Sequence, residues 1–439
     1  MTVGPFASRL IAPLFSDPAV NAALTDEAAM AAMVRVEAAL AAVQGRLGVI
    51  PVSAAARIGE ALEDFAADFN AIGADTTVTG VPTVEFVAQL RRHVGGDAAT
   101  YVHWGATSQD IIDTGFVLQA RTVLETADRR LASIVAKLKT LADAHRATPM
   151  AGRTRSQQAL PISFGLKAAR WAQPPIAHRE RLAQMRARVL RVQFGGAAGN
   201  LSALGPDGLA VADALADELG LAPAPANSHV ARDGIGELAS WLAMVAGSLG
   251  KIGHDVALMA MTEVGELADS AGGGSSTLPQ KANPIAAETL MALATFTASQ
   301  LAAVHQAAPQ EHERGGAGWT VEWMVLPPML AAAGGALRTA DAMLDRLIVR
   351  PERMRANIEA SNGLLLAESA SYALSAHMPR IEAQAIVKSA CREVVDTGEN
   401  LIDLLQNRTA APCDWDSLRD PASRLETDSR LIDRIFAGS

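Results

Sequence analysis

A run of apolar residues spaced by seven is the feature that most constrains the fold of this chain. It follows Asp110 and continues toward Pro149 through about four heptads without a break. At 1.5 Å per residue such a helix would be roughly 50 Å long, which is more than a small globular domain needs. The run therefore predicts an extended bundle of long helices. Its positions are Val117, Leu124, Leu131 and Leu138, interleaved with Ala120, Ala127, Ile134 and Leu141.

Other helix signals and the lack of strand signals point to the same class of fold. Thr25 is a predicted N-cap, with Asp26 and Glu27 in the first turn. No segment alternates convincingly with period two, and aromatic residues make up only 4% of the chain. We expect an all-α protein of three helical domains with a central long-helix bundle. The expected bounds are 1–110 for the N-terminal domain, 111–350 for the bundle and 351–439 for the C-terminal domain. Further helices are expected within 166–190, 236–262 and 289–304.

Composition excludes several classes of protein. Charged residues are 19% of the chain, against roughly 25% in ordinary soluble proteins, so much of the surface is expected to be buried between subunits. The net charge of −9 lacks the basic footprint of a nucleic-acid-binding protein. The two cysteines form no CxxC pattern, and no secretory signal is visible, so we expect a cytoplasmic protein. The longest uncharged stretch, 289–310, is interrupted by Gln300, His305 and Gln306 and predicts a buried helix rather than a membrane span.

The segment 272–284 combines glycines and hydroxyl residues with a lysine and an Asn-Pro pair. By composition it could be a flexible linker. Alternatively, it could be a lid whose backbone N–H groups stabilise a serine alkoxide, with Lys281 facing a substrate carboxylate that gains negative charge. The string GSSTLPQKANP resembles the GSSxMPxKxN signature of the fumarase/aspartase superfamily, with Leu278 where Met is usual. The resemblance implies that Ser275 is the base that forms a carbanion and that Lys281 and Asn283 contact the substrate.

A second block, HWGATSQD, stands immediately before the heptads, at residues 103–110. Hydroxyls and free N–H groups at a helix start suit a carboxylate, although a simple helix cap would need only Ser108 or Asp110. The family resemblance implies that Thr107 and Ser108 contact a substrate carboxylate. His103 stands where adenylosuccinate lyases have a His, and it could serve either catalysis and binding or structure alone.

A third block, GRTRSQ at residues 152–157, is similar to the GRTHxQ block of the superfamily. It implies a substrate-binding role for Arg153, Thr154 and Gln157. Arg155 replaces the His of most lyases. An arginine cannot shuttle protons near neutral pH, but it can hold a carboxylate through two hydrogen bonds. Either the general acid lies elsewhere, or the substrate carries one more carboxylate, or Arg155 merely pairs with a neighbouring acid.

Two further sequence segments, QEHER at 310–314 and the stretch 363–384, narrow the resemblance to the 3-carboxy-cis,cis-muconate cycloisomerase branch of the superfamily. The branch implies reversible lactone formation through a carbanion in aromatic-compound degradation by the β-ketoadipate pathway. It also implies a homotetramer whose active sites are shared between subunits, without metal or organic cofactor. A small polycarboxylate would need a positive cleft, for which we select Arg153, Arg155, Lys281 and Arg314.

Two other functions remain open from the sequence. A C–N lyase or epimerase could act on an N-substituted aspartate such as adenylosuccinate or iminodisuccinate, with Arg155 holding the extra carboxylate. A catalytically inactive structural relative is the other alternative, and retention of Ser275, Lys281 and Asn283 argues against it. The acidic turn at 311–313 lacks an HExxH pattern, so no metal site is expected there.

Overall fold

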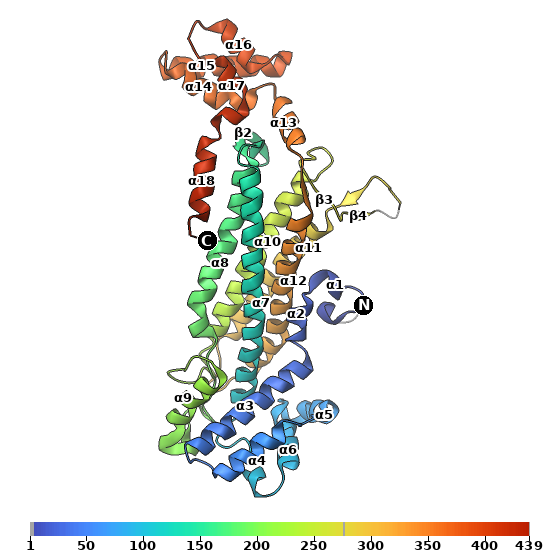
Figure 1. Ribbon diagram of the computed structural model, residues 1–439, viewed down its shortest axis with the longest axis vertical. Coiled ribbons are helices and arrows are strands. Elements are labelled where there is room, and N and C mark those ends of the chain that lie inside the picture. Colours follow the sequence, from blue (N-terminus) through green and yellow to red (C-terminus); the bar gives the residue numbers. More distant parts are fainter. Residues whose placement is uncertain (1–3, 275–276, 439) are drawn as a thin grey trace. The chain divides into compact units, whose positions relative to one another are not determined.

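The computed structural model describes residues 4–274 and 277–438, and helices make up most of it, which confirms the all-α prediction (Figure 1). The α-helices are α1 (Ala12–Phe15), α2 (Pro18–Ala22), α3 (Asp26–Arg46), α4 (Val52–Leu62), α5 (Phe69–Thr79), α6 (Thr83–Val94), α7 (Ser108–Ala144), α8 (Phe164–Val189), α9 (Gly208–Leu219), α10 (Asp233–Met259), α11 (Ile285–Ala307), α12 (Ala317–Arg346), α13 (Pro351–Glu359), α14 (Ala367–Ser375), α15 (Arg380–Thr397), α16 (Leu401–Arg408), α17 (Trp415–Arg419) and α18 (Glu426–Phe436). The strands are β1 (Pro149–Thr154), β2 (Gln157–Ser163), β3 (Leu267–Asp269), β4 (Gly273–Gly274), β5 (Ala282–Asn283) and β6 (Leu347–Val349).

Packing divides the chain into two compact units, each assembled from three separate segments. Unit 1 contains residues 1–130, 178–247 and 292–338, and unit 2 contains 131–177, 248–291 and 339–439. The boundaries fall inside the long helices α7, α8, α10, α11 and α12. The three domains expected from the sequence are instead continuous segments of the chain, and that division stays a prediction.

The heptad run forms α7, the longest of the described helices. It begins at Ser108 and ends at Ala144, which corresponds to a length of about 55 Å. The four residues spaced by seven are buried, with Leu124, Leu131 and Leu138 fully inaccessible to solvent. The heptad periodicity therefore identified both the helix and its buried face.

In unit 1, α3 illustrates how local sequence sets the ends and the packing of a helix. The Thr25 hydroxyl accepts the backbone N–H of Ala28 at 3.1 Å, which confirms the predicted N-cap. One face of α3 is buried, and the helix packs against α4 and α9. Gly45 allows the approach to α4, because a Cβ there would lie 2.5 Å from the Cβ of Ala55.

The long helices contact one another through polar groups within each unit. In unit 1 the indole N–H of Trp241 on α10 donates to the backbone oxygen of His178 on α8 at 3.0 Å. In unit 2 the Lys137 ammonium of α7 lies 2.7 Å from a carboxylate oxygen of Asp341 on α12. Such buried or half-buried pairs set the register of neighbouring bundle helices.

Unit 2 also contains short antiparallel strand pairs that the sequence reading did not predict. β1 pairs with β2, β3 with β6 and β4 with β5. The hairpin β1–β2 was missed because its burial does not alternate: most of β1 is buried and most of β2 is exposed. At the C-terminal end, α14, α15, α16 and α17 enclose a separate apolar cluster that includes Leu374, Val387, Leu401 and Leu405 (Figure 1).

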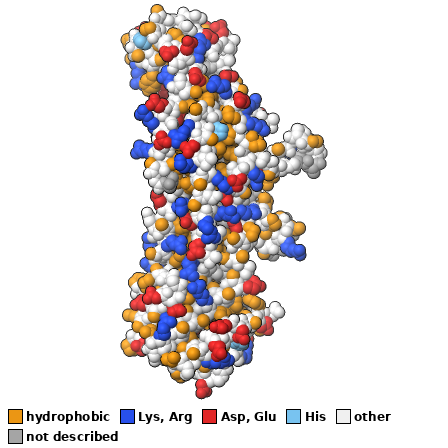
Figure 2. Space-filling model, viewed as in Figure 1, with side chains coloured by type: hydrophobic (Ala, Val, Ile, Leu, Met, Phe, Trp, Pro, Cys, Tyr) orange, Lys and Arg blue, Asp and Glu red, His pale blue; other side chains and the backbone are white. Residues whose placement is uncertain are grey.

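Two of the described helices, α3 and α12, have the length and mean hydropathy of a membrane span. Their most apolar windows are 61% and 67% buried inside the protein, as in core helices of a bundle. On the face drawn in Figure 2, basic and acidic side chains are interspersed and apolar side chains lie among them. Four exposed apolar residues lie on long helices: Met244, Leu258 and Met324 at 44%, 57% and 62%, and Ile285 at 38%.

Candidate active site

The predicted site residues fall into two groups, one in each unit. His103, Thr107, Ser108 and Arg314 belong to unit 1. The predicted residues of 153–157, together with Lys281 and Asn283, belong to unit 2. Ser275, the predicted base, lies outside the described residues. Each group is described separately below.

The turn at 103–107 leads into the start of α7, and its backbone is held by the helix that follows. The backbone N–H of Thr107 donates to a carboxylate oxygen of Asp110 at 2.9 Å, and the backbone N–H of Asp110 donates to the Thr107 oxygen at 3.0 Å. Ser108 is the first residue of α7, where backbone N–H groups lack partners within the helix. The helix start therefore presents donors together with the Thr107 and Ser108 hydroxyls.

Arg314 contacts this turn directly, as a substrate-binding pair would require. One terminal nitrogen of its guanidinium donates to the Thr107 hydroxyl at 2.9 Å. The other donates to the backbone oxygens of Gly196 and Ala197 at 3.2 and 3.0 Å. Its buried Nε has no hydrogen-bond partner in the described part of the chain. No carboxylate of the described residues lies within ion-pair distance of Arg314, so its positive charge is uncompensated and favours an anionic ligand.

His103 has an acidic partner that the sequence motifs did not identify. Its Nδ1 lies 2.5 Å from a carboxylate oxygen of Glu37 on α3, and Glu37 is buried. Burial opposes the charged imidazole, but the charge and hydrogen bond of Glu37 outweigh it and raise the pKa of His103 above its ordinary value. The backbone of His103 has a φ of 65°, in the left-handed region. Because 66 residues separate this pair, no local signal could have revealed it.

In unit 2 the hairpin β1–β2 carries the third predicted block. Thr154 and Gln157 are the last paired residues before the turn, and both are exposed. The two residues between them, Arg155 and Ser156, have φ values of 49° and 65°. Positive φ at both central positions is the geometry of a type I′ hairpin turn, which normally selects Asn or Gly. Arg155 therefore adopts an unfavourable backbone conformation at the hairpin tip, and such positions cluster at functional sites.

The two arginines of this hairpin differ in their partners. Both terminal nitrogens of Arg153 donate to the Glu266 carboxylate, at 2.9 and 2.7 Å, and Glu266 is fully buried. Glu266 also accepts the side-chain amide of Asn357 at 2.8 Å. Arg155 is exposed, and among the described residues it has no ion-pair or hydrogen-bond partner. The charge of Arg153 is thus balanced within the protein, whereas that of Arg155 is not.

The lysine and asparagine of the first block lie on a second, smaller hairpin. β4 pairs with β5 so that Gly273 faces Asn283 and Gly274 faces Ala282. The two ends of the segment are therefore joined, unlike the ends of an extended linker. Glycine is required at position 273 because the Ile285 side chain lies close to it: a Cβ there would lie 2.5 Å from a side-chain carbon of Ile285. Lys281 is exposed and Asn283 is half-buried.

Comparisons with known proteins identify the family to which the chain belongs. The chain matches the family model described as Lyase over residues 16–297. It is 40% identical to the 3-carboxy-cis,cis-muconate cycloisomerase of Pseudomonas aeruginosa, across 98% of this chain and 96% of that protein. It is 38% identical to trans-aconitate decarboxylase 1 of Mycosarcoma maydis, across 97% of this chain and 88% of that protein. The crystal structure of β-carboxy-cis,cis-muconate cycloisomerase from Acinetobacter calcoaceticus matches with a TM-score of 0.91 and 35% identity, across 98% of this chain and all of that one.

The chain therefore belongs to this lyase family and is an enzyme of the fumarase/aspartase superfamily. Its similarity to proteins named as muconate cycloisomerases extends over nearly the whole chain. The resemblance predicted from the sequence blocks is confirmed. The roles of the individual residues in those blocks stay predictions.

Proposed function

We propose that this enzyme interconverts 3-carboxy-cis,cis-muconate and 4-carboxymuconolactone without a metal or an organic cofactor. The observation that carries the proposal is the uncompensated guanidinium of Arg314, hydrogen-bonded to Thr107 beside the N-terminus of α7. Such a site suits one carboxylate of a polycarboxylate substrate. The 40% identity to a cycloisomerase along nearly the full chain supports the choice of substrate.

In the lactone-opening direction, the alkoxide of Ser275 removes a proton from the carbon next to a carboxylate and becomes the hydroxyl. The electron pair left behind forms the new carbon–carbon double bond as the ring carbon–oxygen bond breaks, and the ring oxygen becomes a muconate carboxylate. In the closing direction the carboxylate oxygen adds to the double bond and the same serine returns the proton. Lys281 and Asn283 stabilise the enediolate-like intermediate, and one well-placed donor of this kind contributes about 3 kcal/mol.

The remaining predicted residues bind and orient the substrate. Thr107, Ser108 and Arg314 hold one carboxylate, and His103 lies in the same turn, where Glu37 balances the charge of its protonated form. Arg155 holds a second carboxylate, with Thr154 and Gln157 beside it on the hairpin. Arg153 contributes less to the positive cleft, because Glu266 balances its charge. These cations are needed because a tricarboxylate approaches a chain with a net charge of −9.

We further propose a cytoplasmic homotetramer in which residues from different subunits complete each active site. The family resemblance, the low charged fraction of 19% and the exposed apolar side chains on α10 and α12 support this assembly. A large apolar interface is the usual reason for such a composition.

The test presents the purified protein with 3-carboxymuconate and follows loss of the conjugated diene by absorbance and formation of the lactone by NMR. We expect turnover without added metal, and none by the Ser275→Ala variant. Trans-aconitate, adenylosuccinate and iminodisuccinate are assayed in parallel, because one relative is named as a decarboxylase and because a C–N lyase would cleave an N-substituted aspartate. Faster turnover of any of these, with no lactone formed from 3-carboxymuconate, would contradict the proposal.

A further inference from the structure

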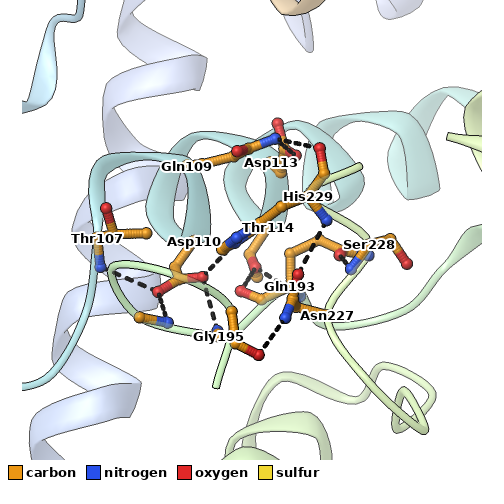
Figure 3. A network of polar contacts seen from close by, with 12 residues as sticks. Thr107, Gln109, Asp110, Asp113, Thr114, Gln193, Gly195, Asn227, Ser228 and His229 are labelled. Atoms are coloured by element: carbon orange, nitrogen blue, oxygen red, sulfur yellow. Dashed lines mark hydrogen bonds and ion pairs between the residues drawn. The ribbon is translucent and has the colours of Figure 1, made fainter. Parts of the chain in front are cut away.

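The carboxylate of Asp110 is the centre of a buried network in unit 1 that the proposed reaction does not use. It is fully inaccessible to solvent and accepts four hydrogen bonds (Figure 3). One oxygen accepts from the backbone N–H of Gly195 at 2.8 Å and from Nε2 of His229 at 2.7 Å. The other accepts from the backbone N–H groups of Thr107 at 2.9 Å and Gly196 at 3.0 Å. Asp110 thus joins three stretches of chain that are far apart in sequence.

Four hydrogen bonds link Asp110, Gly196, Arg314 and Thr107 into a closed ring. Asp110 holds the N–H of Gly196, and the oxygen of Gly196 accepts from Arg314. Arg314 in turn donates to the Thr107 hydroxyl, and the backbone N–H of Thr107 donates to the Asp110 carboxylate. Gly196 has a φ of 68°, and a Cβ there would lie 3.0 Å from the Gly105 oxygen, so the ring requires glycine at this position. Displacement of Asp110 would therefore move both Thr107 and the acceptors of Arg314.

His229 holds Asp110 from the opposite side. A carboxylate only accepts hydrogen bonds, so the Nε2 of His229 carries the proton that it shares with Asp110. The backbone of His229 is held as well: its N–H donates to the Asn227 side chain at 3.1 Å, and its oxygen accepts the side-chain amide of Gln109 at 3.1 Å. The Nδ1 of His229 is buried and has no hydrogen-bond partner within residues 4–274 and 277–438. An unsatisfied buried acceptor is destabilising, so stability alone does not account for a histidine here.

We propose that Asp110 and His229 are positioning residues that orient Thr107 and Arg314 for a substrate carboxylate. This inference rests on the proposed function, because it takes Thr107 and Arg314 as binding groups. His229 donates one hydrogen bond to Asp110. Through its other three hydrogen bonds, Asp110 fixes the helix start and the loop at 195–197. Neither residue touches the substrate.

The test compares His229→Leu, which removes the donor, with His229→Gln, whose amide nitrogen can replace Nε2. We expect His229→Leu to raise KM for 3-carboxymuconate by about tenfold, with kcat changed far less, because a binding contact shared by ground and transition states is weakened. His229→Gln should recover most of the affinity. Asp110→Asn, which replaces one acceptor oxygen by a donor, should raise KM at least as much as His229→Leu.

Thr114→Val is the matched control for a loss of buried hydrogen bonds. The Thr114 hydroxyl donates to the Gln193 oxygen at 2.9 Å and accepts its N–H at 3.0 Å, without contacting the ring (Figure 3). We expect this variant to lower the melting temperature while KM stays near the wild-type value. An unchanged KM in His229→Leu, or an equal rise in Thr114→Val, would overturn the positioning role.

Binding of tricarballylate, a saturated tricarboxylate that cannot react, separates this inference from the proposed function. Isothermal titration calorimetry measures its Kd for the wild type and for each variant that folds. Weaker binding in His229→Leu, restored in His229→Gln, supports the positioning role even if the wild type fails to lactonise 3-carboxymuconate. Equal binding by all variants contradicts it, whatever the activity assay shows.

Discussion

The helix start in unit 1 and the two hairpins in unit 2 carry the same kinds of predicted binding residue but differ in how those residues are held. Thr107 is hydrogen-bonded through its backbone to Asp110 and through its hydroxyl to Arg314. Arg155 and Lys281 are exposed, and the described part of the chain offers them no ionic partner.

Under the proposed binding roles, this difference locates the entropy cost of substrate binding. A preorganised group binds without ordering its own side chain, whereas each long exposed side chain loses roughly 0.5–1.5 kcal/mol of rotamer freedom when it is immobilised. We infer that the helix start supplies a rigid anchor and that the hairpin cations become ordered only when the substrate or a neighbouring subunit arrives.

The largest expected effect is the loss of Ser275, the proposed base, which lies outside the described residues. Ser275→Ala should lower kcat by roughly a thousandfold or more, because the proposed mechanism uses no other base. Steady-state kinetics measure the loss, and light scattering checks that the assembly is unchanged. By comparison, Thr107→Val at the helix start of unit 1 should mainly raise KM for 3-carboxymuconate. Near-normal turnover by Ser275→Ala would remove this serine from the mechanism.

Arg153 and Arg155 provide the sharpest contrast within one hairpin. Arg153→Met should lower the free energy of unfolding by about 3 kcal/mol, because it leaves the buried Glu266 carboxylate without its counter-ion. Chemical denaturation measures the change. Arg153→Met combined with Glu266→Gln should recover part of the stability, since the unpaired charge is gone. A fully stable Arg153→Met protein with a raised KM would instead place Arg153 at the substrate.

Arg155→Lys should show the opposite behaviour. It keeps the charge but loses the planar two-point geometry, so binding of the intact substrate should weaken by about 1 to 3 kcal/mol. Its melting temperature should stay unchanged, because Arg155 has no partner to lose among the described residues. Arg155→His is the companion variant: it should lose the native reaction without gaining adenylosuccinate cleavage. A lowered melting temperature with an unchanged KM would exclude the binding role.

The smallest effect concerns His103 and the pH dependence of stability. The pKa of His103 is raised in the folded protein, so protonation stabilises the fold. This contribution is fully present below about pH 6.5, the ordinary histidine value, and is lost as pH rises through the higher folded-state pKa. Glu37→Gln should weaken this dependence. Thermal melts of both proteins across this range measure the difference, and parallel curves would show that Glu37 does not stabilise the charged imidazole.

Much of the fold could be predicted from local signals. The cap at Thr25, the heptads of α7 and the helices within 166–190, 236–262 and 289–304 depend on residues within a few turns of one another. The hairpin β1–β2 could not be predicted from its burial pattern. β1 is buried through most of its length while β2 is exposed, so period-two alternation is absent from both strands.

The sequence by itself determined the helical class, the long buried helix and the three blocks that hold the predicted site residues, because periodicity, capping and motifs are local properties. The tertiary structure alone decided that Arg153 is neutralised and that Arg155 has no ionic partner within residues 4–274 and 277–438. Arg153 meets Glu266 from 113 residues away, and Asp110 meets His229 from 119 residues away. Whether a charge is compensated depends on distances of a few ångström and on burial, and only the folded chain brings such distant groups within that range.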